Sequence, residues 1–169
     1  MININYSDLR KYDTSNGSGI GTSLFCSGCK FNCPFCFNKE AQDFNYKEPF
    51  TKEVEDRLIS YAKDVHVNHV SLLGGEVFQQ DLDIILNLVK RIKNEVNKPI
   101  YIWTGFLWSE LMKDSKKIEI LKYVDVVTDG RFEQDKKDLN LKFKGSSNQV
   151  TIDVQRSISV GKVVKFNWK

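Results

Sequence analysis

The chain has 169 residues, of which 41% are hydrophobic, 12% aromatic and 28% charged, a composition typical of one folded domain rather than of a disordered chain. Its net charge of +3 comes from 25 basic and 22 acidic residues that are mixed along the sequence, so no basic stripe indicates a nucleic-acid partner. The length excludes a complete (βα)8 barrel, which takes about 250 residues, and no apolar run approaches the roughly 20 residues that span a bilayer.

Short apolar runs of strand length alternate with stretches whose apolar residues follow helical spacing. Thr51 is a typical helix N-cap, because acidic residues follow it in the first turn. In chain order, the predicted elements are a turn at 16–19, a strand over 20–25, a helix from 51 to about 63, a strand over 70–73, a helix over 79–97, a strand over 100–103, a helical stretch over 107–121 broken near 114–115, a strand over 124–127 and a strand-like segment over 160–166.

Strands that recur every 24 to 30 residues or so, with helices between them, predict right-handed crossovers and a parallel sheet. The fold class is therefore α/β. In such sheets the ligand site lies at the carboxyl ends of the strands. Four segments follow directly after predicted strands: the cysteine-containing loop, Gly74-Gly75-Glu76, Thr104-Gly105 and Asp129-Gly130. We expect these four segments to meet at one edge of the sheet.

All four cysteines of the chain, Cys26, Cys29, Cys33 and Cys36, fall within one short segment. Their spacing suits neither a disulfide framework nor the usual zinc pairs, which are separated by about 15–20 residues. One interpretation uses all four thiols for zinc or a closed cluster. The other uses the C-x3-C-x2-C set of Cys29, Cys33 and Cys36 for a [4Fe–4S] cluster whose fourth iron stays open to a substrate.

Cys26 ends an apolar strand, so a packing role is expected for it. His66 and His69 are expected to be exposed at the edge of a strand rather than to bind a metal.

The three-cysteine motif and the later Gly-Gly-Glu resemble the radical S-adenosylmethionine (SAM) enzymes. More closely, the chain resembles the anaerobic ribonucleotide reductase activating proteins, which are glycyl-radical activating enzymes. The matching motifs run in family order from about residue 6 to 150 and are Asn16-Gly17-x-Gly19, Ser27-Gly28-Cys29-x3-Cys33-x2-Cys36-Phe37-Asn38, Pro49-Phe50-Thr51-Lys52-Glu53, Gly74-Gly75-Glu76, Trp103-Thr104-Gly105-Phe106, Val126-x2-Asp129-Gly130-Arg131-Phe132 and Gly145-Ser146-Ser147-Asn148-Gln149. The chain departs from the family pattern at Val77 and Ser18, where Pro is common, and at Lys144, where Arg is common.

The resemblance implies that Cys29, Cys33 and Cys36 hold a [4Fe–4S] cluster, whose open iron chelates the methionine amino and carboxylate groups of SAM. It also implies a partial (βα) barrel of the radical SAM type. The single domain would cover 1–169, with 151–169 as an unassigned C-terminal extension.

The remaining cofactor contacts are also implied by the resemblance. Gly74 and Gly75 would let the backbone approach SAM without a Cβ in the way, and Glu76 would offer an anion to its ammonium group. Phe35 and Phe37 would line the adenine side. Thr104 and Asp129 have two alternative roles, as turn or capping residues or as SAM contacts.

The implied reaction is reductive cleavage of SAM to a 5′-deoxyadenosyl radical, which abstracts a hydrogen from a glycine of the anaerobic ribonucleotide reductase large subunit. Flavodoxin or ferredoxin would donate the electron. The N-terminus shows no signal peptide, so we expect a cytoplasmic protein without a membrane partner. Two alternatives stay open: a small radical SAM enzyme resembling the deazapurine synthases, and a non-catalytic zinc or iron–sulfur module that binds another protein.

Overall fold

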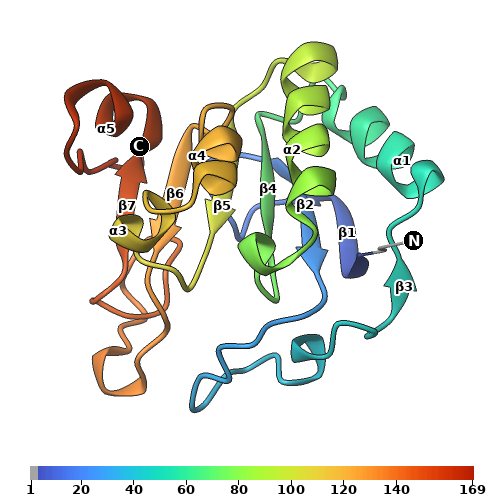
Figure 1. Ribbon diagram of the computed structural model, residues 1–169. Helices are drawn as coiled ribbons and strands as arrows, with labels where there is room; N and C mark the ends of the chain where they lie inside the picture. Colours follow the sequence, from blue (N-terminus) through green and yellow to red (C-terminus); the bar gives the residue numbers. More distant parts are fainter. Residues whose placement is uncertain (1–3) are drawn as a thin grey trace.

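A seven-stranded sheet organises the chain in the computed structural model, which describes residues 4–169 (Figure 1). The strand order is β3-β1-β2-β4-β5-β6-β7, and the four strands β2, β4, β5 and β6 run parallel. Antiparallel strands flank them: β1 and β3 on one side and β7 on the other. The strands are β1 Asn5–Asp13, β2 Gly21–Cys26, β3 Glu48–Pro49, β4 His69–Gly74, β5 Ile100–Trp103, β6 Val126–Asp129 and β7 Val150–Asp153. The predicted α/β class and its parallel sheet are confirmed.

Most of the α-helices begin at polar caps that the sequence supplies. Thr51 accepts a hydrogen bond from Val54 N at the start of α1, and Asp81 and Asp114 cap α2 and α4 in the same way. The predicted break near 114–115 is confirmed, because it separates α3 from α4. The helices are α1 Lys52–Ala62, α2 Leu82–Arg91, α3 Trp108–Leu111, α4 Ser115–Leu121 and α5 Val154–Val160, and a π-helical turn, Ile92–Val96, extends α2.

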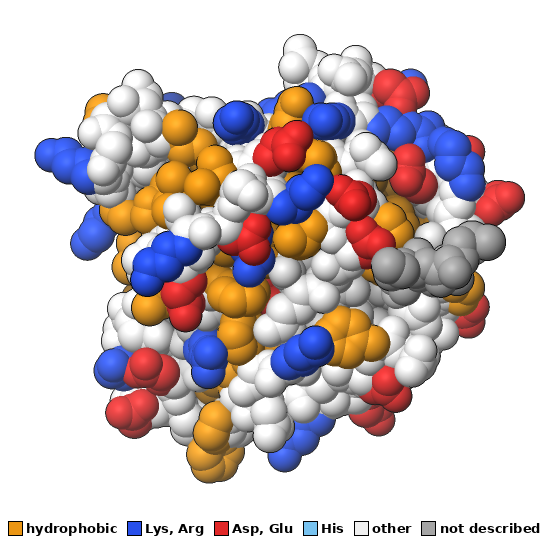
Figure 2. All heavy atoms as spheres, in the orientation of Figure 1, with side chains coloured by type: hydrophobic (Ala, Val, Ile, Leu, Met, Phe, Trp, Pro, Cys, Tyr) orange, Lys and Arg blue, Asp and Glu red, His pale blue; other side chains and the backbone are white. Residues whose placement is uncertain are grey.

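The core lies between the sheet and its helices. Leu24, Leu72, Ile102 and Val127 come from the four parallel strands, and all are fully buried against the apolar faces of α1, α2 and α4. Figure 1 shows these three helices together on one side of the sheet. On the outer surface of that side, basic and acidic side chains are interspersed without a patch of one sign (Figure 2). No helix in residues 4–169 has the length and apolar character needed to cross a membrane.

Because side chains alternate along a strand, the opposite face of the sheet carries different residues, and His69 is among them. The expectation that His69 is exposed was wrong, since the residue is fully buried. Its ring stacks on Tyr101 at 4.5 Å between centroids, and Nε2 donates to the Asn16 carbonyl at 2.9 Å. Ser71 donates to the same carbonyl. The turn at 16–19 thus covers the amino ends of the parallel strands. His66 is exposed, as expected.

The C-terminal segment also differs from expectation. The predicted strand over 160–166 was wrong: α5 ends at Val160, Gly161 follows with a φ of +76°, and the segment contributes one isolated bridge between Lys165 and Ile152. The helix forms here because Asp153 caps it at the Arg156 N–H. Residues 161–169 then cross the sheet face opposite the core, where Trp168 packs edge-on against Tyr101.

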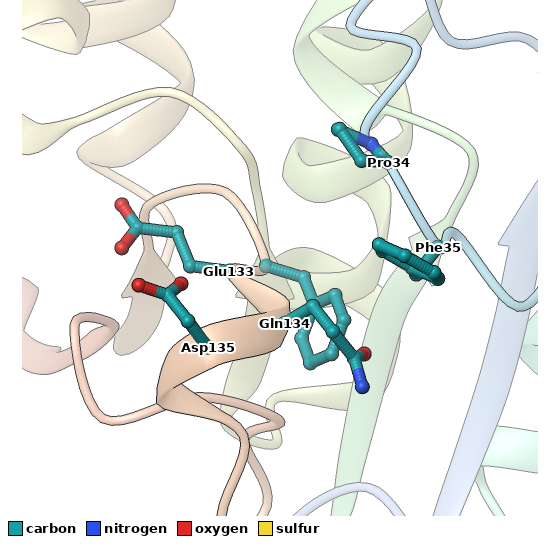
Figure 3. Close-up of a pocket in the computed structure, with 6 residues that line it drawn as sticks. Pro34, Phe35, Glu133, Gln134 and Asp135 are labelled. Atoms are coloured by element: carbon teal, nitrogen blue, oxygen red, sulfur yellow. The ribbon is translucent and has the colours of Figure 1, made fainter.

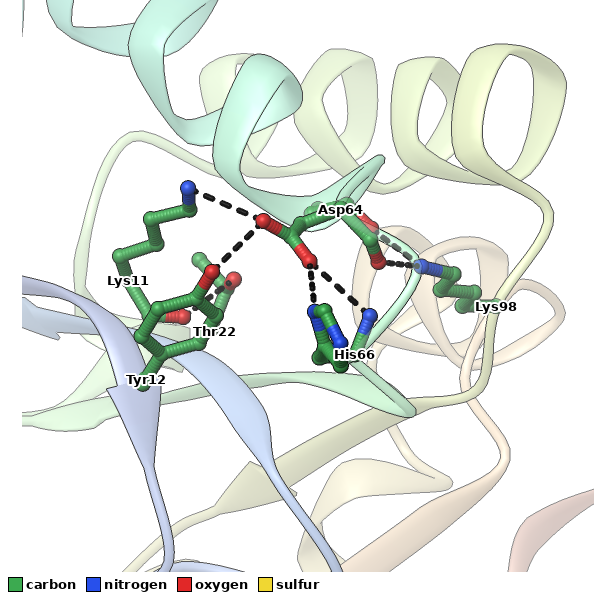
Figure 4. A network of polar contacts seen from close by, with 7 residues as sticks. Lys11, Tyr12, Thr22, Asp64, His66 and Lys98 are labelled. Atoms are coloured by element: carbon green, nitrogen blue, oxygen red, sulfur yellow. Dashed lines mark hydrogen bonds and ion pairs between the residues drawn. The ribbon is translucent and has the colours of Figure 1, made fainter.

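A polar network joins β1, the end of α1 and the start of β5 (Figure 4). The Asp64 carboxylate accepts a hydrogen bond from the Tyr12 hydroxyl at 2.7 Å and pairs with Lys11 at 3.0 Å. Lys98 donates to the carbonyls of Ala62 and Asp64, which closes the C-terminal end of α1. The hydrogen bond from Tyr12, more than the Lys11 ion pair, holds the pKa of Asp64 well below its usual range.

This pKa has a consequence for stability. A carboxyl group whose folded-state pKa is lowered stabilises the fold above its unfolded pKa of about 3.9, and that contribution is lost as the pH falls further. We therefore expect Asp64→Asn to be less stable than the wild type at pH 7, and the difference to shrink below about pH 4. Urea unfolding at pH 7 and pH 3 measures this. Glu53→Gln, on the exposed face of α1, is the control, and a difference independent of pH would contradict the assignment.

Candidate active site

The four predicted segments meet at the carboxyl ends of the parallel strands. Cys26 is in register with Gly74, and Trp103 with Thr128, so β2, β4, β5 and β6 end at the same edge of the sheet. Backbone hydrogen bonds join their loops: Gly75 N donates to Cys26 O at 2.7 Å, and Thr104 N donates to Thr128 O at 3.0 Å. The loops that follow β2, β4, β5 and β6 therefore form one cluster at the predicted edge of the sheet.

Cys29, Cys33 and Cys36 lie on the loop that follows β2, and each is a free, half-buried thiol. At the start of the loop, Cys29 N donates to Gln42 O at 3.0 Å and anchors it. Within the motif, Cys36 N donates to Cys33 O at 3.2 Å and closes a turn. In residues 4–169 no three His, Cys, Asp or Glu side chains are grouped closely enough to hold a metal ion. In a cubane each thiolate binds a different iron, so its ligands lie farther apart than those of a single ion. Three thiols on one short loop fit that donor set.

Cys26 differs from the other three cysteines. It is 1% exposed at the end of β2, and burial raises the pKa of its thiol to about 12. Burial also raises the thiol pKa of Cys29 and Cys33, but those two thiols are only half-buried, whereas Cys26 is enclosed in the hydrophobic core. The expected packing role of Cys26 is confirmed.

The Gly-Gly-Glu turn after β4 packs against the backbone of the cysteine loop. Gly74 has a φ of +108°, and a Cβ there would lie 2.5 Å from Cys26 N; a Cβ on Gly75 would collide with the carbonyl of Gly28. Glu76 N donates to that same carbonyl at 2.8 Å. Glycine is thus required for a close approach between two protein segments. The approach of this turn to SAM stays a prediction.

The Glu76 side chain connects the turn after β4 to the turn after β5. It is 2% exposed, and its carboxylate accepts hydrogen bonds from Thr104 Oγ1 at 2.7 Å, Gly105 N at 2.7 Å and Phe78 N at 3.1 Å. Burial raises the pKa of this carboxyl, while the hydrogen bonds oppose that shift. Its predicted contact with the SAM ammonium is untested. The structure adds a positioning role that the sequence analysis did not foresee.

Thr104 and Asp129 both serve as turn or capping residues. Thr104 Oγ1 accepts from Phe106 N at 3.1 Å while it donates to Glu76. Asp129 accepts from Trp108 N, at the start of α3, at 2.7 Å, and burial raises its carboxyl pKa. A SAM contact for either residue stays a prediction.

The Thr104 hydroxyl is expected to contribute to stability. Thr104→Val removes a donor and an acceptor from a buried site, so we expect a loss of about 2–4 kcal/mol in the free energy of unfolding. Thr104→Ser keeps the hydroxyl and is the matched control, with an expected loss of about 1 kcal/mol for the missing methyl group. Urea unfolding measures both, and equal losses would show that the hydroxyl is not the stabilising group.

Phe35 and Phe37, the predicted adenine-side residues, are 70% and 99% exposed. Figure 2 shows apolar side chains at the lower end of the molecule, where Figure 1 places the loop after β2. Phe35 lines an open cavity of about 460 Å³ between this loop and the segment after β6. Figure 3 shows Phe35 facing Gln134 there, with the carboxylates of Glu133 and Asp135 at the other end.

A chain of aromatic and basic side chains links the cysteine loop to its neighbours, and the sequence analysis missed it. The Phe31 ring meets Phe106 edge-on at 4.9 Å between centroids, the Arg131 guanidinium lies 4.2 Å from the centroid of Phe31, and Lys117 Nζ lies 3.9 Å from that of Phe106. The sequence did offer one indication of this contact. Arg131 directly follows Asp129-Gly130, a segment already predicted to lie at the site.

A parallel sheet with a three-cysteine loop at the carboxyl end of its first parallel strand defines a radical SAM-type domain with one iron–sulfur cluster. Comparison with known families agrees, because the model of the 4Fe-4S single cluster domain matches residues 15–152.

The chain belongs to the anaerobic ribonucleoside-triphosphate reductase-activating proteins. It is 37% identical over 151 residues to the member from Pasteurella multocida, covering 87% of this chain and 96% of that protein. It is 39% identical over 151 residues to the member from Escherichia coli K12, covering 87% and 97%. The member from Enterobacteria phage T4 is 32% identical over 148 residues, covering 86% and 92%. The family is one of radical SAM glycyl-radical activases, whose cofactors are a [4Fe–4S] cluster and SAM.

Proposed function

We propose that this chain activates an anaerobic ribonucleoside-triphosphate reductase by generating a glycyl radical on it. The observation that carries the proposal is the joining of the three-cysteine loop to the Gly-Gly-Glu turn through Gly75 N–Cys26 O and Glu76 N–Gly28 O. It keeps the two segments that would hold the cluster and SAM at a fixed spacing. Membership of the family supports the same conclusion.

Cys29, Cys33 and Cys36 would hold the cluster through their thiolates. When bound, the cluster and SAM supply a one-electron reductive cleavage that yields methionine and a 5′-deoxyadenosyl radical able to abstract a glycine hydrogen. The backbone of Gly74 and Gly75 would position the methionine end of SAM. Glu76 would keep the turns after β4 and β5 together, through Thr104 and Gly105. Its carboxylate is also the anion proposed to face the SAM ammonium.

The aromatic residues of the loop have proposed roles at its open side. Phe35 and Phe37 would cover the adenine, since both rings are exposed on the cysteine loop and Phe35 lines the cavity beside it. Asp129, whose carboxylate accepts a hydrogen bond from Trp108 N, and Thr104, whose hydroxyl donates to Glu76, are also proposed to contact SAM. The electron donor is proposed to be a flavodoxin or ferredoxin, and the location cytoplasmic.

The test uses the anaerobically reconstituted and reduced protein, mixed with SAM and the reductase. We expect 5′-deoxyadenosine to form and a glycyl radical to appear on the reductase by EPR. SAM turnover without that radical would refute activation and favour a small-molecule substrate. A colourless zinc protein that leaves SAM intact would favour a non-catalytic module.

A further inference from the structure

A second cavity, of about 320 Å³, lies away from the cysteine loop, between the segment before β7 and the C-terminal residues. None of its lining residues belongs to the cysteine loop or to the Gly-Gly-Glu turn. They are Lys142, Lys144, Ser147, Gln149, Val150, Thr151, Lys165, Phe166, Asn167 and Trp168. We infer that this cavity binds a small polyanion carrying two or more phosphate groups, of the nucleoside triphosphate class.

The charge of the cavity is the first argument. Three lysines line it and no aspartate or glutamate does. Within residues 4–169, no ion pair joins Lys142, Lys144 or Lys165 to an acid. The Lys144 ammonium donates one hydrogen bond, to Gln149 O at 2.8 Å, out of the three that it can donate. An anion in the cavity would be attracted by all three of these cations.

The backbone around the lysines is the second argument. Phe143, between Lys142 and Lys144, has a φ of +55°, which a bulky L residue rarely adopts. Two contacts hold it there: Trp103 Nε1 donates to its carbonyl at 2.6 Å, and its ring meets Trp168 at 5.0 Å between centroids. Strained conformations held in this way cluster at ligand-binding sites. Here the conformation of Phe143 sets the backbone direction of its two neighbours, Lys142 and Lys144, which both line the cavity.

The other walls suit phosphate oxygens. Ser147 and Asn167 bring hydroxyl and amide donors to the cavity. The Trp168 indole N–H is buried and has no hydrogen-bond partner among the described residues, so this wall of the cavity holds an unused donor. Phe166 and Trp168 add aromatic surface.

The volume of the cavity and its positive charge distinguish among possible ligands. SAM is not the expected occupant, because its sulfonium and ammonium outweigh its carboxylate and make it a net cation. A cavity of about 320 Å³ lies at the small end of the range for small-molecule sites. An acidic protein segment would need an extended surface instead. A compact molecule with several negative charges fits best.

The test is calorimetric titration of the full chain with tripolyphosphate, ATP, orthophosphate and adenosine, with tryptophan fluorescence as a second readout. We expect tripolyphosphate and ATP to bind, orthophosphate to bind more weakly and adenosine not to bind, with affinity falling as KCl is added. Comparison of ATP with tripolyphosphate shows whether the base contributes.

The double variant Lys142→Gln/Lys165→Gln is expected to lower the affinity at least ten-fold. Lys162→Gln is the matched control, since Lys162 is exposed on the same C-terminal segment but does not line the cavity. Unchanged urea midpoints would show that both variants fold. The inference is overturned if millimolar tripolyphosphate and ATP do not bind, or if the double variant binds them as well as the wild type. If the wild type binds neither polyphosphate, and the double variant nevertheless loses reductase activation, the inference is overturned and an acidic segment of the reductase is indicated as the occupant.

Discussion

Cys33→Ala is expected to abolish both cluster binding and SAM cleavage, reducing 5′-deoxyadenosine to background after anaerobic reconstitution. Two thiolates cannot hold three irons of a cubane, and no other thiol is available: Cys26 is buried, with its pKa raised to about 12. The same result is expected for Cys29→Ala and Cys36→Ala. Iron content, the visible absorbance of the cluster and nucleoside formation measure the effect.

Cys26→Ala is the control for these three variants. It removes a small buried group, so we expect a loss of about 1–2 kcal/mol in stability with iron content and SAM cleavage retained. Loss of metal in Cys26→Ala as well would show that all four cysteines are ligands. That result would contradict the three-thiolate site and support a closed metal module.

Gly74→Ala is expected to have the largest effect of any single methyl group added at the site. Gly74 has a φ of +108°, and the new Cβ would lie 2.5 Å from Cys26 N and 2.6 Å from Cys26 O. Backbone atoms cannot rotate away as a side chain can, so β2 and β4 would have to separate. We expect a loss of about 3–5 kcal/mol in the free energy of unfolding, together with loss of SAM cleavage.

Gly161→Ala separates the two causes of that loss. Gly161 also has a positive φ, of +76°, but a Cβ there meets nothing within 4 Å. Only the conformational cost remains, about 1 kcal/mol, and SAM cleavage is expected to be unchanged. Urea unfolding of both variants measures the difference. Equal losses would show that backbone conformation, and not the contact with Cys26, makes Gly74 necessary.

The central strands were predictable because parallel strands buried on both faces read as continuous apolar runs. β4 and β5 lie where the apolar runs place them, and the Thr51 cap fixes the start of α1. β1 was not predicted. Its nine residues, Asn5–Asp13, are mostly polar and half-exposed, so no apolar alternation marks them. The strand forms because β2 offers it an antiparallel partner.

The positions of the site residues were predictable, but their contacts were not. The rule that ligand sites lie at the carboxyl ends of parallel strands places Glu76, Thr104 and Asp129 together. That Glu76 accepts hydrogen bonds from Thr104 and Gly105 depends on side-chain directions that no local pattern records. The burial of His69 is a similar case, because it depends on the Asn16 carbonyl, far away in sequence.

The hydrogen bonds between the cysteine loop and the Gly-Gly-Glu turn have a thermodynamic consequence. Because Cys26 O and Gly28 O accept from Gly75 N and Glu76 N, ordering either segment also orders the other. Binding of the cluster and binding of SAM should therefore be positively coupled. By linkage, the factor by which SAM raises the affinity for the cluster equals the factor by which the cluster raises the affinity for SAM. Each cofactor would then act as a stabiliser of the other.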